Sequence, residues 1–65
     1  MKKLLRIKDV CIDIGLSKSY IYQLVSNNQF PKPIQIVEGG SAKAWVATEV
    51  AEWVDQRIES RNEAA

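Results

Sequence analysis

The side chains best suited to chemistry in this sequence lie along residues 18–27. Polar residues recur there at three- and four-residue intervals, which would place them on one side of an α-helix; they are Lys18, Ser19, Tyr22 and Gln23. Glutamine can bond bidentately to adenine, serine can bond base edges or phosphate, and lysine can contact phosphate or guanine. This set is typical of a surface that binds duplex DNA.

The two tyrosines of this stretch have two possible roles. A tyrosine ring can pack on a sugar or a thymine methyl while its hydroxyl reaches a phosphate. The same ring can instead cover the edge of a core and keep its hydroxyl in water. We expect Tyr22 to contact DNA, and for Tyr20 both roles stay open.

Catalytic and metal-binding groups are scarce in this composition. The chain has no histidine and a single cysteine, Cys11, which excludes zinc sites of the usual Cys/His type and catalysis that needs an imidazole. Cys11 is most simply a small buried hydrophobe. We therefore expect no enzyme, no metal and no cofactor.

Two short helices joined by a tight turn must position the polar row. Apolar residues at i, i+3, i+4 and i+7 predict a helix over residues 7–14. Gly15 suits the left-handed backbone that ends such a helix, and Ser17 suits the N-cap of a second helix over 18–27. Ile21 would lock that helix onto the first. This is the helix-turn-helix arrangement, although a purely structural helical hairpin also needs a glycine turn.

A β-hairpin is predicted after the second helix. Pro31 and Pro33 forbid a helix, residues 34–37 alternate as a half-buried strand, and residues 42–46 return as its partner. Gly39 and Gly40 form a turn signal, and a loop of these two residues would set Ile34 opposite Trp45. Ser41 and Lys43, near the tip, would then touch the DNA backbone, unless Lys43 is only a solvated hairpin lysine.

A last helix is predicted over residues 49–61, with Thr48 as its N-cap. The fold class that follows is mainly α with a small β-hairpin, a winged helix-turn-helix, in one domain over residues 1–65. Its core is expected to contain the apolar residues of all these elements, namely Ile7, Val10, Cys11, Ile14, Leu16, Ile21, Leu24, Val25, Phe30, Ile34, Ile36, Trp45, Val50, Trp53, Val54 and Ile58.

Charge is distributed unevenly along the chain, although the net charge is only +1. Residues 1–46 carry seven basic and three acidic side chains, whereas residues 47–65 carry two basic and five acidic ones. A basic body with an acidic tail suits a body that meets an anion and a tail that faces away. Supporting positive charge would come from Lys2, Lys3, Arg6 and Lys32.

No apolar run approaches the about 20 residues that cross a bilayer, so we expect a cytoplasmic protein without membrane contact.

Several stretches of the sequence together resemble the AlpA family of prophage regulators, which are related to MerR-type winged helix-turn-helix proteins and to phage excisionases. The stretches are "LLRIKDV", "GLSKSYIYQLV", "FPKPIQI" and "AWVATEVAEWVDQRI". The resemblance implies a DNA-binding regulator in which Lys18, Ser19 and Tyr22 match family positions. Gln23 and the Ser41–Lys43 stretch depart from it, because arginine is common at these places in the family.

The resulting prediction is a sequence-specific, double-stranded-DNA-binding transcriptional regulator of a prophage or other mobile element. The candidate DNA-binding residues are Arg6, Ser17, Lys18, Ser19, Tyr20, Tyr22, Gln23, Lys32, Ser41 and Lys43. One such domain makes few contacts, so a homodimer or binding to tandem sites is possible. The alternatives are an excisionase-like architectural factor that bends DNA in recombination, and a protein-interaction module that binds no DNA.

Overall fold

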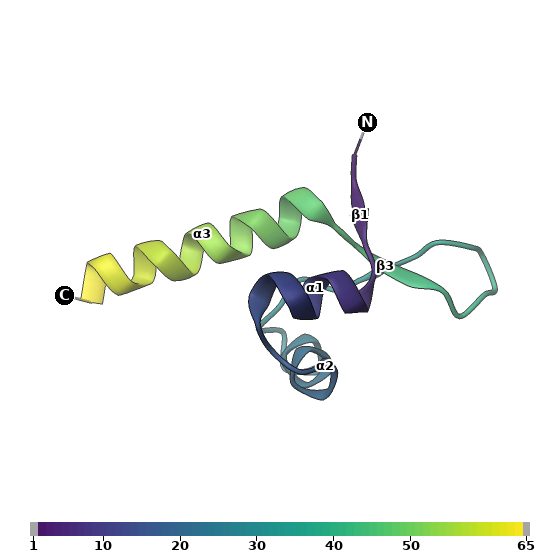
Figure 1. The fold of residues 1–65 in the computed structure, drawn as a ribbon, viewed down its shortest axis with the longest axis horizontal. Coiled ribbons are helices and arrows are strands. Elements are labelled where there is room, and N and C mark those ends of the chain that lie inside the picture. The colour runs from purple at the N-terminus through teal and green to yellow at the C-terminus, as the bar shows by residue number, and fades with distance from the viewer. Residues whose placement is uncertain (1, 65) are drawn as a thin grey trace.

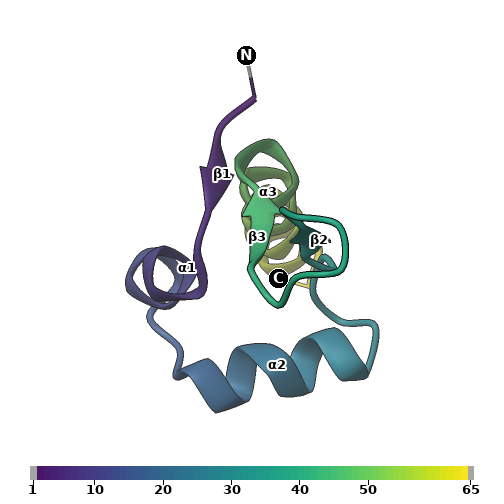
Figure 2. The same cartoon turned by 90° about the vertical axis from the view of Figure 1, so that its right-hand side faces the viewer.

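Three helices and a three-stranded antiparallel sheet make up the fold. The computed structural model describes residues 2–64. The elements are β1 (Leu4–Leu5), α1 (Ile7–Ile14), α2 (Lys18–Ser26), β2 (Ile34–Gln35), β3 (Lys43–Val46) and α3 (Ala47–Ala64). The strand order is β1-β3-β2, with α2 on one side of the sheet (Figure 2). Helix α3 runs away from the rest of the chain (Figure 1). The predicted winged helix-turn-helix is confirmed.

The turn between α1 and α2 has the predicted chemistry. Gly15 adopts a left-handed backbone (φ 81°), and its N–H donates to the Cys11 carbonyl at 2.8 Å, so it ends α1. The Tyr20 N–H donates to the Ser17 hydroxyl oxygen at 3.2 Å, so Ser17 caps α2. These two ends fix the angle at which α2 leaves α1.

Strand β1 was not predicted from the sequence. Leu4 pairs with Val46 and Leu5 with Trp45, and the Ala47 N–H donates to the Lys3 carbonyl at 2.9 Å. Two residues are too few to show the alternation that marks a strand, and their partner lies about forty residues away in the sequence. The pairing ties the N-terminal segment to the middle of the sheet.

The hairpin register differs from the one predicted. Ile34 pairs with Ala44, not with Trp45, and the Ile36 N–H donates to the Ala42 carbonyl at 3.0 Å. The loop therefore spans residues 37–41 rather than only the two glycines. Its turn is closed by the Gly40 N–H donating to the Val37 carbonyl, with Gly39 at φ 78° in the third position. That position of a type II turn requires a positive φ, which explains where the glycine lies.

Helix α3 is longer than predicted at both ends. It begins at Ala47, so Thr48 lies inside the first turn and is not the N-cap, and it continues past residue 61 to Ala64. The helix begins earlier than predicted because β3 leads directly into it. The Ala47 N–H is bonded to the Lys3 carbonyl, so the strand ladder satisfies one of the first-turn donors that have no partner within the helix.

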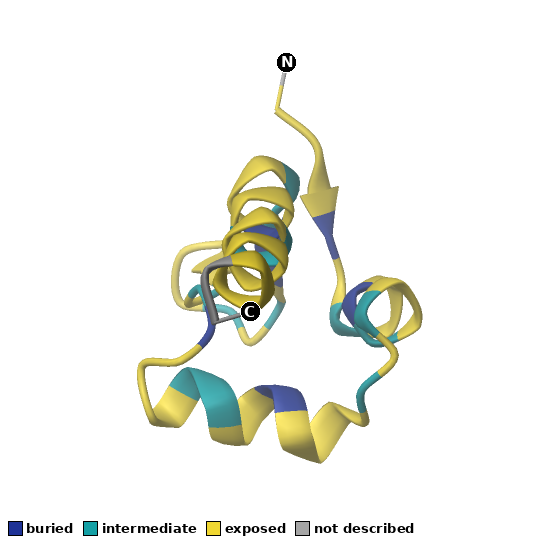
Figure 3. Cartoon of the chain, turned by 90° about the vertical axis from the view of Figure 1, so that its left-hand side faces the viewer, coloured by how far each residue is buried: buried dark blue, intermediate teal, exposed yellow. Residues whose placement is uncertain are grey.

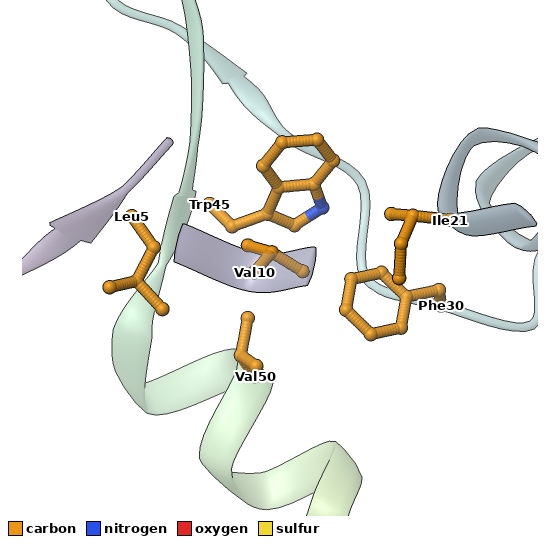
Figure 4. Packing of buried hydrophobic residues seen from close by; sticks show 6 residues of the cluster. All are labelled: Leu5, Val10, Ile21, Phe30, Trp45 and Val50. Atoms are coloured by element: carbon orange, nitrogen blue, oxygen red, sulfur yellow. The ribbon is translucent and has the colours of Figure 1, made fainter. Parts of the chain in front are cut away.

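The core is centred on Trp45, which is completely buried against residues from both helices of the motif (Figure 4). Its buried cluster also contains Leu5, Val10, Ile21, Phe30 and Val50. The predicted core members Ile34, Ile36 and Ile58 are instead 42%, 42% and 47% exposed, because the hairpin and the end of α3 project beyond the core. Leu5 and Ala44 are buried and were not predicted.

Two indole hydrogen bonds fix the segment that connects α2 to the hairpin. The Trp45 Nε1–H donates to the Pro31 carbonyl at 2.7 Å, and the Trp53 Nε1–H donates to the Gln29 carbonyl at 2.8 Å. The Phe30 ring packs edge-on against both indoles, at centroid distances of 6.4 Å from Trp45 and 4.9 Å from Trp53. The hairpin is therefore held at a defined place relative to α2.

Candidate nucleic-acid interface

The outward side of α2 carries the predicted row of polar side chains. Lys18, Ser19, Tyr22 and Gln23 are all exposed, whereas Ile21 is completely buried. The outer side of α2 is accordingly exposed, and the buried part of the helix faces the rest of the chain (Figure 3). Leu24 and Val25 pack partly buried against the same core. The apolar stripe thus anchors the helix and turns its polar side to solvent.

The start of α2 adds backbone donors to this row. The N–H groups of Lys18 and Ser19 lie in the first turn, where no earlier helical carbonyl can accept from them. Ser17 is exposed, and its hydroxyl oxygen accepts from Tyr20 N–H, which leaves the hydroxyl proton available to a ligand. Such a helix start favours an anionic group, and a phosphate is the anion that duplex DNA presents.

The Tyr22 ring has a structural contact as well as an exposed part. Its centroid lies 5.9 Å from that of Trp45, with a tilt of 50°, and 39% of the side chain remains exposed. Tyr20 is more exposed, at 52%. Tyr22 therefore joins α2 to β3 and so couples the two elements of the candidate interface.

The hairpin presents Lys43 on the same side of the sheet as α2. Lys43 and Trp45 are two residues apart in β3, so their side chains leave the same face, and Trp45 packs toward α2. Ser41 is exposed in the loop beyond it. The structure thus brings Lys43 to the side of the sheet that faces α2, with Ser41 exposed in the adjoining loop.

Gln35 is a hairpin residue that the sequence reasoning missed. It pairs with Lys43 across the ladder, and its side-chain amide donates to the Gly40 carbonyl in the loop. The contact spans a five-residue loop whose length the sequence does not reveal. Gln35 therefore supports the loop that carries Ser41.

Arg6 and Lys32 are not brought to this surface. Arg6 continues β1 in an extended conformation, so it points to the same side as Leu4, away from Leu5 and the core. Lys32 borders a hollow between the segment after α2 and α3, together with Glu49 and Glu52. The predicted set therefore separates into the α2–hairpin group and these two cations.

Residues 2–64 contain neither a metal-binding cluster nor a membrane-spanning helix. No group of three or more histidine, cysteine, aspartate or glutamate side chains within that range is arranged to hold a metal ion. None of the helices in that range is both long and apolar enough to span a bilayer.

The fold defines a small winged helix-turn-helix protein with an exposed polar side on α2. A family model described as prophage CP4-57 regulatory protein (AlpA) matches residues 3–58. The chain belongs to this AlpA family, which confirms the resemblance found in the sequence. It is also 37% identical over 60 residues to the uncharacterized protein ORF88 of Enterobacteria phage P4. That match covers 92% of this chain and 66% of the relative, slightly under two thirds of its length. No solved structure was found to match.

Proposed function

We propose that this protein is a sequence-specific double-stranded-DNA-binding regulator of transcription in a prophage or other mobile element, acting in the bacterial cytoplasm. The observation that supports it best is the exposed polar side of α2, set beside a hairpin whose Lys43 leaves the same face of the sheet as Trp45. Membership of a prophage regulatory family supports the same conclusion.

In this proposal, α2 lies in the major groove. Gln23 bonds an adenine edge, and Ser19 and Lys18 bond neighbouring bases or phosphates. The first-turn N–H groups of α2 hold a phosphate, with help from the Ser17 hydroxyl. Ser41 and Lys43 contact the backbone from the hairpin, and Tyr20 and Tyr22 pack on sugars at the groove edge. Arg6 and Lys32 contribute at most through the long-range field.

Binding of a single copy is expected to be weak, because few side chains reach the DNA. We propose that two copies bind tandem sites, or bind as a dimer, to reach a useful affinity.

An excisionase-like role in recombination would use the same contacts on a different stretch of DNA, the attachment site. Footprinting distinguishes the two, since protection of a promoter supports the regulator and protection of the attachment site supports the excisionase.

The experiment that tests DNA binding is titration of short duplexes at two salt concentrations, after selection of bound sequences from a random pool. Lysines that displace counterions lower log K with log salt by about 0.9 per phosphate contact, so two or three contacts give a slope of about −2 to −3. Absent or salt-insensitive binding would contradict the proposal and support a protein-interaction module instead.

A further inference from the structure

The hairpin loop, residues 37–41, is held by the side chain of a strand residue as well as by its own backbone. The backbone closes the turn, because the Gly40 N–H donates to the Val37 carbonyl at 2.9 Å. The Gln35 side-chain amide then donates to the Gly40 carbonyl. This second bond restrains the side of the loop that leads into Ser41.

Gln35 lies next to both hairpin residues that are proposed to contact DNA. It is the cross-strand partner of Lys43, so the two side chains leave the same face of the sheet. The carbonyl that accepts from Gln35 belongs to Gly40, and the planar peptide group that contains this carbonyl also contains the Ser41 nitrogen. Holding the Gly40 carbonyl therefore fixes the orientation of the peptide group through which the chain enters Ser41.

The Gln35 bond lies where it adds little to the stability of the fold. Gln35 is exposed, so its amide would bond water if the contact were absent. A glutamine side chain also loses rotamer freedom when it is held in one place. The loop, in contrast, contains two glycines, and an unrestrained glycine backbone is more mobile than that of other residues. The main effect of the contact is therefore to order the loop.

We propose that Gln35 is a positioning residue for DNA binding, which sets the hairpin loop so that Ser41 and Lys43 meet the phosphate backbone together. The inference rests on the proposed function and adds to the same interface a residue that acts through the loop and not by contact with DNA. A loop that is ordered before binding has less conformational entropy to lose when it meets a phosphate. Loss of the Gln35 bond should therefore weaken the backbone contacts of the hairpin and leave base reading by α2 unchanged.

Gln35→Met tests this role, because methionine has a similar length and cannot donate to the Gly40 carbonyl. Affinity should fall about fivefold for matched and mismatched duplexes alike, and the magnitude of the salt slope should fall by up to about 1, because a phosphate contact is loosened. The free energy of unfolding should stay as in the wild type. Gln56→Met is the matched control, since it makes the same change at an exposed position of α3 and should alter none of these values.

Combined variants show whether Gln35 acts through the hairpin. When Ser41 and Lys43 are both changed to alanine, adding Gln35→Met should weaken binding by less than about twofold, because the contacts that it positions are already absent. With Gln23→Ala as the background, the whole effect of about fivefold should remain, because α2 makes a separate contact. In the DNA-free protein, NMR relaxation of the backbone amides of residues 38–41 should show order parameters that fall from about 0.85 toward about 0.6 in Gln35→Met.

Failure of DNA binding and failure of the positioning role give different results. A wild-type protein that binds no duplex would contradict the proposed function itself. Wild-type affinity in Gln35→Met, order parameters like those of the wild type, or a fall in stability that accounts for the lost affinity would each overturn the positioning role alone. A loss of affinity that persists in full without Ser41 and Lys43 would mean that Gln35 contacts the DNA directly, which also overturns it.

Discussion

At the scale of single residues, α2 separates side chains with a folding role from side chains without one. Ile21 is completely buried, and Ser17 caps the helix. Tyr22 has a folding role and an exposed part, because its ring packs on Trp45 while 39% of the residue stays exposed. Gln23 and Lys18 are exposed, and binding is the role we assign to them.

Gln23 and Lys43 should respond differently to removal of their side chains. Gln23→Ala is expected to relax the preference at one base pair by about 1–3 kcal/mol, because a bidentate bond to adenine is lost. Lys43→Ala should weaken binding to all sequences alike and reduce the magnitude of the salt slope by about 1, because a phosphate contact is lost. Competition titrations with matched and mismatched duplexes measure both. If both variants lose affinity with unchanged preference, the assignment of α2 as the reading surface is wrong.

Tyr22 allows its two contacts to be tested apart. Tyr22→Phe keeps the ring on Trp45 and should leave the free energy of unfolding nearly unchanged, whereas Tyr22→Leu should lower it by about 1 kcal/mol through loss of the aromatic pair. Urea denaturation gives these values. If Tyr22→Phe also weakens DNA binding, the hydroxyl contacts the DNA; unchanged binding would limit Tyr22 to a positioning role.

At the scale of elements, short-range patterns predicted α1, α2 and their turn because every signal lies within a few residues. Gly15 and Ser17 act on neighbouring backbone groups, so their roles can be read locally. The hairpin register could not be predicted this way, since a loop of two residues and a loop of five contain the same glycines. Strand β1 could not be predicted for another reason: its partner β3 is distant in sequence. Among the candidate DNA contacts, the residues of α2 share one surface, which helix periodicity predicts. The position of Arg6 could not be predicted, because it depends on β1.

The cost of replacing Gly15 should come from its backbone conformation alone. A Cβ at this position would meet no atom within 4 Å, so any cost of Gly15→Ala comes from the positive φ of 81°. That left-handed conformation costs about 1–2 kcal/mol for a residue with a Cβ. Gly15→Asn is the matched control and should cost less, because asparagine tolerates this conformation better. Equal losses for both variants in urea denaturation would point to a role other than backbone conformation.

At the scale of the whole molecule, stability is concentrated around one tryptophan. Trp45 contacts residues from α2 and the segment after it, pairs with β1, and donates to the Pro31 carbonyl. A chain of 65 residues buries a small core, so single core side chains carry a large share of its stability. The outer half of α3 lies outside that arrangement, and its residues from Asp55 to Asn62 are exposed.

This uneven distribution predicts that a large deletion costs less than a small core change. Removal of residues 59–65 should change the free energy of unfolding by no more than about 0.5 kcal/mol, because residues 59–62 are exposed. Val50→Ala removes two methyl groups from a side chain that is 4% exposed and should cost about 2 kcal/mol, through lost burial and a cavity. Thermal and urea denaturation of the two variants give the comparison. A deletion that destabilises the protein more than Val50→Ala would mean that the end of α3 supports the fold.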